Sequence, residues 1–230
     1  MVSVGGKSLD LKYPVVEVPG GTGLCLDIGC GSGRHRKLIE AAGYTWIGVD
    51  IDTSRGVARL AEADACALPF KSGSFDLVWM NCVLEHIQNP WSGLLEMHRV
   101  LKEGGRLVGV SGYLDPDSTH YCALTYLGLR QALSDAGFSR SDIRPATATF
   151  PVILRKYLMY LTGCEGWSTR VAFAACRLMF VPLEKTLLVL GLLRNALPGR
   201  SVSAYGERFR QRSREIDRDF AAYLVFRALR

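Results

Sequence analysis

Short apolar runs alternate with amphipathic stretches through the first two thirds of this sequence. Buried strands are predicted for the apolar runs at 24–28, 46–49, 57–63, 75–80 and 106–111. Two further strands are expected at 139–149 and 220–229. Strands that alternate with helices favour a parallel sheet with helices on both faces. We therefore expect an α/β fold with a doubly wound, mostly parallel sheet of seven strands.

Two helices carry clear start and stop signals. Asn89 can cap the first helix, Pro90 suits its first position, and Gly104 can close it in the left-handed conformation. The second helix is expected between Thr125 as its N-cap and Gly137 as its end. The residues expected on the buried face of the first helix are Trp91, Leu94, Leu95 and Leu101.

The chain is expected to consist of a core at 1–149, a helical insertion at 150–218 and a closing strand within 219–230. Helical texture is found at 151–161, 169–181 and 182–197, and no apolar run approaches the ~18 residues that a membrane span needs. We expect the insertion to pack on the sheet as a cap on the acceptor side. Its aromatic and basic side chains favour either an acceptor pocket, added core, or a surface that docks on a membrane.

Composition narrows the class of protein. The seven cysteines are scattered without a C-x-x-C pair, which predicts neither a zinc site nor disulfides and fits a reducing cytosol. No signal-peptide pattern opens the sequence, so a cytoplasmic protein is expected, with peripheral membrane contact as an alternative. The net charge is +6, with a basic excess after Arg200 that suits either an anionic partner or a solvated helix face.

A glycine-rich turn follows the first predicted strand, in LDIGCGSG at 26–33. Glycines at 29, 31 and 33 let a ligand approach the backbone, and Asp27 before them suits a positively charged ligand. The dinucleotide fingerprint would need glycine where Arg34 stands, which counts against a nicotinamide dehydrogenase.

Two more acids follow the next predicted strands. Asp50 can accept hydrogen bonds from both hydroxyls of a ribose, and Asp64 can accept one from an adenine amino group. Each acid by itself could be a strand-end cap or a turn former. Three acids at the carboxyl ends of successive strands favour a ligand, because such sheets bind ligands at that edge.

Four stretches together resemble the class I, small-molecule S-adenosylmethionine-dependent methyltransferases. They are LDIGCGSG, GVDID, DACALPFKSGSFDLVWMNCVLEHIQNP and EMHRVLKEGGRL, in the family's order within about residues 20–138. Three departures are the short Asp50–Asp64 spacing, Glu103 in place of a common proline, and Tyr121–Thr125 in place of a family arginine motif.

The resemblance implies a Rossmann-like fold that binds S-adenosyl-L-methionine and releases S-adenosyl-L-homocysteine. The turn would hold the methionine part, Asp50 the ribose, and Asp64 with Ala65 the adenine, with Arg34 and His35 near the methionine carboxylate. The full set of cofactor-binding residues implied is Asp27, Gly29, Gly31, Gly33, Asp50, Ile51, Asp64, Ala65, Met80 and Asn81.

The acceptor is expected to be a small or lipid-linked molecule, methylated on a hydroxyl oxygen or, alternatively, on nitrogen or carbon. A hydroxyl acceptor must lose a proton, and His120 and His86 are the candidate bases; His98 is expected to serve packing. Nucleic-acid methylation is disfavoured because Asn81 is not followed by the proline-rich motif of base methyltransferases. A non-catalytic cofactor-binding scaffold remains the alternative outside enzymes. The oligomeric state is not indicated.

Overall fold

The computed structural model describes residues 16–52, 60–112, 120–146 and 223–230. The predicted helical insertion at 150–218 lies outside these residues. So do residues 53–59, where the family's usual helix would fall. Among the residues that the structure describes, no helix combines the length and apolar character required to cross a membrane.

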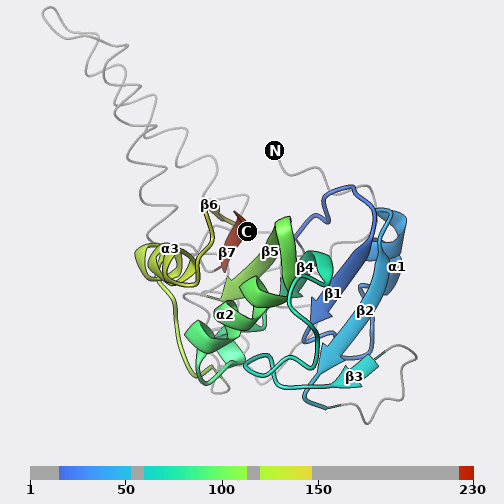
Figure 1. The fold of residues 1–230 in the computed structure, drawn as a ribbon. Helices are drawn as coiled ribbons and strands as arrows, with labels where there is room; N and C mark the ends of the chain where they lie inside the picture. The colour runs from blue at the N-terminus through green and yellow to red at the C-terminus, as the bar shows by residue number, and fades with distance from the viewer. Residues whose placement is uncertain (1–15, 53–59, 113–119, 147–222) are drawn as a thin grey trace, which may run out of the picture. The chain divides into compact units, whose positions relative to one another are not determined.

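Seven strands form one sheet (Figure 1). The strands are β1 (Leu24–Ile28), β2 (Thr45–Asp50), β3 (Leu60–Glu62), β4 (Phe75–Asn81), β5 (Leu101–Gly112), β6 (Arg140–Pro145) and β7 (Tyr223–Leu229). The helices are α1 (Arg36–Ala41), the short 3-10 helix η1 (Leu84–His86), α2 (Pro90–Val100) and α3 (Tyr126–Asp135).

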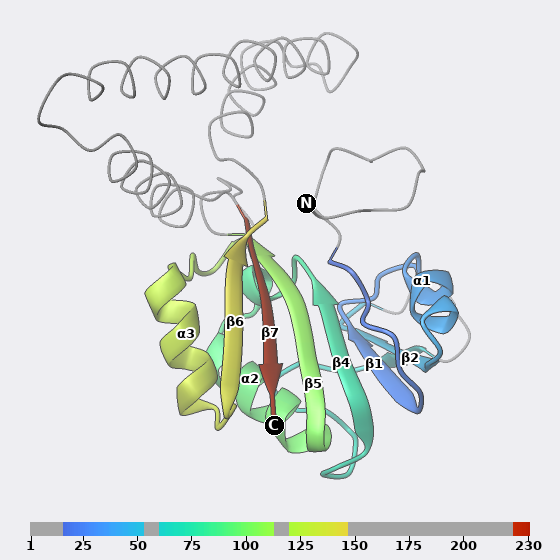
Figure 2. The same ribbon diagram turned by 90° about the horizontal axis from the view of Figure 1, so that it is seen from above.

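The strand order is β3-β2-β1-β4-β5-β7-β6. The pairs from β3 to β5 are parallel, whereas β7 runs antiparallel between β5 and β6 (Figure 2). The strand order reverses between β1 and β4, and in sheets of this type ligands bind outside the carboxyl ends of the strands at that point. The expected Rossmann-like, mostly parallel seven-stranded sheet is confirmed.

Central strands are buried on both faces, as a sheet covered by helices requires. In β4 the side chains of Leu77, Val78, Trp79 and Met80 are all fully buried. The α1 helix packs on β2, while α2 packs on β5 and touches α3, which packs on β6. The apolar residues from which the strands were predicted therefore form the core. This core holds in place the edge of the sheet at which the strands have their carboxyl ends.

Helix capping was predicted correctly at the helix starts. The side chain of Asn89 accepts a hydrogen bond from the Ser92 backbone N–H at 3.1 Å, and Thr125 accepts one from Gly128 at 2.9 Å. Gly137, at φ 97°, follows α3 as expected. Of the predicted strands at 57–63 and 139–149, the described residues include β3 at Leu60–Glu62 and β6 at Arg140–Pro145.

The predicted end of α2 at Gly104 is wrong. The helix ends at Val100, and β5 begins at Leu101, which pairs with Phe75. Gly104 does adopt a left-handed conformation, at φ 72°, but within the irregular start of β5. Strand pairing therefore outweighs the glycine signal at this position.

The predicted buried face of α2 is correct only in part. Trp91 is 47% exposed and Leu95 is 53% exposed. The buried stripe, with Leu101 continuing it into β5, is formed by Pro90, Gly93, Leu94, Met97 and Val100. These positions follow the spacing of three and four residues of a helix face, and Trp91 and Leu95 lie one step beside it.

Candidate active site

The glycine-rich turn after β1 is held by the neighbouring strand. Gly29 and Cys30 donate backbone hydrogen bonds to the Val49 carbonyl, at 2.8 and 3.1 Å. Gly29, Gly31 and Gly33 adopt φ values of 65°, 54° and 69°, a region in which a side chain is strained. A Cβ on Gly29 would lie 2.5 Å from Cγ2 of Val83. The turn therefore requires glycine at position 29 for two separate reasons.

Asp50, at the end of β2, fixes this turn. Its Oδ2 accepts a hydrogen bond from the Gly31 N–H at 2.7 Å, and its Oδ1 accepts one from Asp52 at 3.1 Å. Each carboxylate oxygen has a second lone pair that can accept a further donor. The next residue, Ile51, leaves 76% of its surface exposed. A polar anchor and an exposed apolar side chain thus stand side by side at the sheet edge.

Asp64 lies just beyond β3, next to the end of β2. The Ala63 N–H donates to the Asp50 carbonyl at 3.0 Å, so the two predicted acids belong to one edge. Asp64 is exposed, and its Oδ1 accepts a hydrogen bond from the Cys66 N–H at 2.8 Å. Ala65 beside it is half-buried. Asp64 is thus a turn former, as the alternative interpretation predicted, and its carboxylate also forms a hydrogen bond with the Cys66 side chain.

Asp27 is a buried acid in β1. It is 1% exposed, and its Oδ2 accepts a hydrogen bond from the Trp46 indole N–H at 2.9 Å. Its Oδ1 has no hydrogen-bond partner among the described residues. Burial raises the pKa of Asp27 to about 7, and Asp50 adds to the rise, while the Trp46 hydrogen bond and Arg34 oppose it. A cationic group that reaches this carboxyl group would stabilise its ionised form.

The end of β4 brings one side-chain amide to the candidate site. The Met80 side chain is fully buried and lies close to Gly109, and the Met80 backbone is paired with Ile28 on one side and Gly109 on the other. Asn81 is half-buried, and its Oδ1 has no partner among the described residues. Cys82 has φ 55°, which is unusual for a residue other than glycine. Backbone strain of this kind is common at functional sites.

Two of the four histidines are not candidate bases: His35 lies beside the glycine-rich turn, and His98 packs elsewhere. The His35 ring is 4.7 Å from the Trp79 ring, and burial lowers the pKa of His35 to about 4, with Arg34 adding to the effect. His35 is therefore neutral at physiological pH. His98 packs edge-to-face on Phe138 at 5.1 Å, in agreement with the packing role expected for it.

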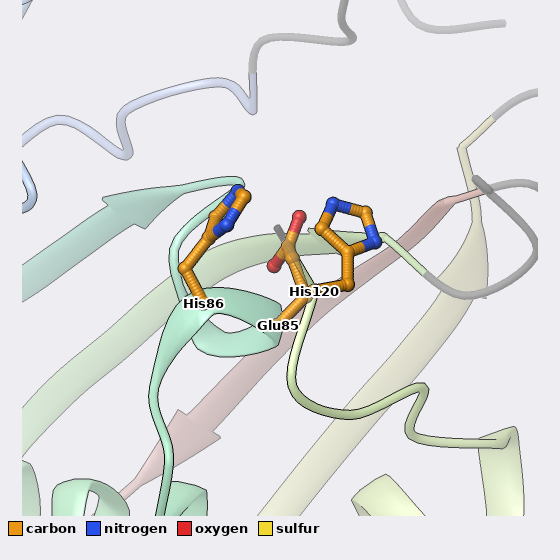
Figure 3. A group of neighbouring side chains, drawn as sticks. All are labelled: Glu85, His86 and His120. Atoms are coloured by element: carbon orange, nitrogen blue, oxygen red, sulfur yellow. The ribbon is translucent and has the colours of Figure 1, made fainter. Parts of the chain in front are cut away.

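The structure brings together the two histidines predicted as candidate bases. The ring centroids of His86, on η1, and His120, in the loop before α3, are 4.8 Å apart and nearly perpendicular (Figure 3). His86 is exposed and His120 is half-buried. The pair follows the carboxyl ends of β4 and β5, so we expect an acceptor molecule to meet it there.

Glu85 supports this histidine pair and was not among the predicted site residues. It is 1% exposed, and its two oxygens accept hydrogen bonds from the Gly112 N–H at 2.9 Å and the Ser111 hydroxyl at 3.2 Å. The Glu85 carbonyl accepts a backbone hydrogen bond from Tyr121 at 2.9 Å, which fixes the segment that carries His120. The one signal in the sequence that could have indicated Glu85 is its position as a charged residue between apolar Leu84 and the candidate base His86.

Comparison with known proteins identifies a family whose model matches the part of the chain that contains the glycine-rich turn and the predicted cofactor-binding residues. Residues 26–109 match the model of a family described as a methyltransferase domain. An uncharacterized methyltransferase of Mycolicibacterium vanbaalenii is 35% identical over 119 residues, which cover 46% of this chain and 47% of the relative. The chain spans about half the length of the curated relatives it matches.

Two solved structures share the fold. One is a S-adenosylmethionine-dependent methyltransferase from Archaeoglobus fulgidus, with a TM-score of 0.57 and 18% identity over 91% of this chain and 87% of that one. The other is the Haemonchus contortus phosphoethanolamine N-methyltransferase 2 in complex with S-adenosyl-L-methionine. Its TM-score is 0.52, with 18% identity over 93% of this chain and 49% of that one.

Proposed function

We propose that this chain, whose residues 26–109 form a class I S-adenosylmethionine-dependent methyltransferase domain, methylates a hydroxyl oxygen of a small or lipid-linked acceptor. S-adenosyl-L-methionine would bind along the ends of β1, β2 and β3, and the acceptor beyond the ends of β4 and β5. The fold and the domain carry the first part of the proposal. The acceptor class rests on the histidine pair.

The residues at the cofactor edge fit this cofactor. The methionine part carries an ammonium and a sulfonium, and the buried Asp27 carboxylate provides a negative charge with one oxygen unpartnered among the described residues. Gly29 has no side chain, so the backbone of the turn can approach the ligand closely. A Cβ at this position would also lie against Val83. Asp50 would hold the ribose hydroxyls, while Ile51 would cover the adenine face and Asp64 would accept from its amino group.

Within the site, the observation that carries the cofactor part of the proposal is the double anchoring of Asp50. Its two oxygens are fixed by the N–H groups of Gly31 and Asp52, so the carboxylate is already oriented. A preorganised acceptor loses little conformational entropy when it binds a diol. This arrangement joins the glycine-rich turn and the β2 acid into one site of the kind that binds nucleosides in such sheets.

The part of the site that would bind the methyl acceptor contains His120, which would act as the base. The cofactor supplies a methyl group activated by the sulfonium, so the protein must align the acceptor oxygen and remove its proton. As the oxygen–carbon bond forms and the sulfur–carbon bond breaks, His120 would take the hydroxyl proton and release it to water. His86, whose ring lies 4.8 Å from that of His120, would help to position the acceptor.

The predicted domain organisation remains part of this proposal. The segment 150–218 would act as the acceptor-side cap, and its aromatic residues would suit an apolar or lipid-linked acceptor. The related phosphoethanolamine N-methyltransferase acts, by its name, on a nitrogen of a small polar molecule. Methylation of nitrogen or carbon is therefore tested alongside the hydroxyl.

The test combines cofactor binding with label transfer. Calorimetry would first measure the binding of S-adenosylhomocysteine to the full chain. S-adenosylmethionine with a deuterated methyl group would then be incubated with phenols, sugars, polyprenyl-linked sugars and amines, and mass spectrometry would identify the labelled atom. We expect tight binding of S-adenosylhomocysteine and label on a hydroxyl oxygen, with turnover reduced ~10²-fold or more in His120→Ala.

Each other outcome contradicts a defined part of the proposal. Absence of S-adenosylhomocysteine binding would overturn the cofactor site. Label found only on nitrogen or carbon would overturn the hydroxyl acceptor. Binding without transfer to any acceptor would favour the non-catalytic cofactor-binding protein.

A further inference from the structure

We infer that Glu85, His86 and His120 form a site for a divalent cation of the zinc type, which holds the acceptor oxygen. One ligand atom from each residue lies within 4.8 Å of the others. Figure 3 shows the side chains of Glu85 and His86, which follow one another on η1, together with His120 from the loop before α3. The role toward the acceptor rests on the proposed function, whereas cation binding stands by itself.

The distances leave room for a cation after a small adjustment. Zinc bonds to histidine nitrogen and carboxylate oxygen at about 2.0–2.2 Å, so tetrahedral ligand atoms lie roughly 3.4 Å apart. The most widely separated of the three ligand atoms, up to 4.8 Å apart, would have to approach one another by up to about 1.4 Å. Rotation of the exposed His86 ring and the half-buried His120 ring can provide this movement.

The supporting hydrogen bonds are those that a metal-binding carboxylate needs. Glu85 is oriented by the Gly112 N–H and by the Ser111 hydroxyl. Outer hydrogen bonds of this kind orient metal ligands and add to metal affinity. The Glu85 carbonyl also binds the Tyr121 N–H, so the same residue fixes the loop that carries His120. Two distant segments are therefore tied together at the proposed site.

The charge of the cluster favours a cation. Glu85 is buried, and within the described ranges no lysine or arginine forms an ion pair with it. A buried carboxylate without a countercharge is costly, and a divalent cation would offset that cost. Neither the cysteine spacing nor the separation of His86 from His120 along the chain indicates a metal, which is why the sequence predicted none.

The donor set selects the kind of cation. Two imidazoles and one carboxylate bind zinc in catalytic sites and leave a fourth position for water or substrate. An alcohol oxygen in that position would release its proton to solvent, because the cation stabilises the alkoxide. The alkoxide would then attack the methyl carbon, and the sulfur–carbon bond would break. In this arrangement His120 holds the cation, and the cation replaces His120 as the group that activates the hydroxyl.

Cobalt provides a direct readout of the site. The full chain would be stripped with a chelator and titrated with Co²⁺, whose visible absorption reports nitrogen and oxygen ligands, and with Zn²⁺ in competition with a fluorescent indicator. We expect one equivalent of either ion per chain. His120→Gln, His86→Gln and Glu85→Gln should each weaken binding at least about tenfold.

Matched variants control for folding and for other histidines. His98→Gln changes a histidine that packs on Phe138 away from the cluster, and it should leave Co²⁺ binding unchanged. Glu85→Gln keeps an oxygen for the Gly112 N–H, so circular dichroism should confirm that it folds. The inference is wrong if the wild type binds no stoichiometric cation, or if His98→Gln loses as much affinity as His120→Gln.

Failure of this inference can be separated from failure of the proposed function. S-adenosylhomocysteine binding is measured in the same metal-free samples. If S-adenosylhomocysteine binds, no cation binds, and label transfer continues in the presence of chelator, then the cation site is overturned and His120 keeps its role as base. If the cation binds but S-adenosylhomocysteine does not, the site is real and the methyltransferase proposal is the one overturned.

Discussion

The two halves of the candidate active site are built in different ways. The proposed cofactor half, at the ends of β1 and β2, consists of backbone groups and acids, such as Gly31 and Asp50, that are hydrogen-bonded to one another. The proposed acceptor half joins η1 to the loop at His120 through the buried Glu85. The first half is therefore fixed by contacts between backbone and carboxylate, whereas the second consists of side chains that one buried residue ties together.

The largest expected effect separates the two halves directly. Asp50→Ala removes the charged acceptor for both ribose hydroxyls, so the Kd for S-adenosylhomocysteine should rise about a hundredfold, by roughly 2.7 kcal/mol. His120→Ala should change that Kd by less than about twofold, because its ring belongs to the acceptor half. Calorimetry on both variants measures the contrast. Equal losses in the two variants would mean that the halves are not separate.

Gly29 lies in the proposed cofactor half, close to Val83, which directly precedes η1, and its substitution is expected to have the next largest effect. Gly29→Ala forces a side chain into a left-handed conformation and against Val83, so the free energy of unfolding should fall by about 2 kcal/mol. Gly73→Ala is the matched control, because Gly73 has φ 68° with no atom within 4 Å of an added Cβ. Urea unfolding that gives equal losses for both variants would remove Val83 from the explanation.

Ionised Asp27 is expected to lower the free energy of unfolding of the ligand-free protein, although it favours binding of the cofactor. Its pKa of about 7 lies above that of an unfolded aspartate, so its stabilising effect is complete at low pH and is lost as pH rises from about 4 through 7. Asp27→Asn should escape this loss and gain at least ~1.4 kcal/mol over wild type at pH 8.

The same substitution should affect binding in the opposite direction. S-adenosylhomocysteine should bind wild type more tightly as pH rises through 7, because the ammonium meets an ionised carboxylate, and Asp27→Asn should lose this dependence. Calorimetry at several pH values measures the effect. Asp142→Asn, at an exposed ion pair with Arg144, is the control. A pH-independent wild type would show that Asp27 does not meet the ligand.

The smallest expected effect concerns the element next to the acceptor half. Thr125→Ala removes the N-cap of α3 and should lower the free energy of unfolding by about 1 kcal/mol. Thr125→Ser should restore most of that loss because it keeps the hydroxyl. The affinity for S-adenosylhomocysteine should stay unchanged in both variants, and a change there would link α3 to the cofactor half.

Prediction from the sequence succeeded where the signals were local. The turn at 26–33, the acids that follow the strands and the caps at Asn89 and Thr125 all depend on neighbouring residues. The expected methyltransferase domain is confirmed over residues 26–109. The roles of the individual site residues remain predictions.

Prediction failed where tertiary contacts decide. The end of α2 is set by the pairing of Leu101 with Phe75, which no helix signal contains. Glu85 was missed because its partners, Ser111, Gly112 and Tyr121, are far away along the chain.

The insertion of β7 between β5 and β6 has a consequence for how such a protein can diversify. Pro145 pairs with Leu224, and Tyr223 pairs with Gly112, whose N–H also binds Glu85. The chain therefore leaves and re-enters the sheet about 5 Å apart, the spacing of adjacent strands, and does so beside the acceptor half. Whatever connects these two points can be exchanged or lengthened by recombination without shifting the strand register. If the segment caps the acceptor as proposed, such an exchange would change the acceptor and leave the cofactor edge unchanged.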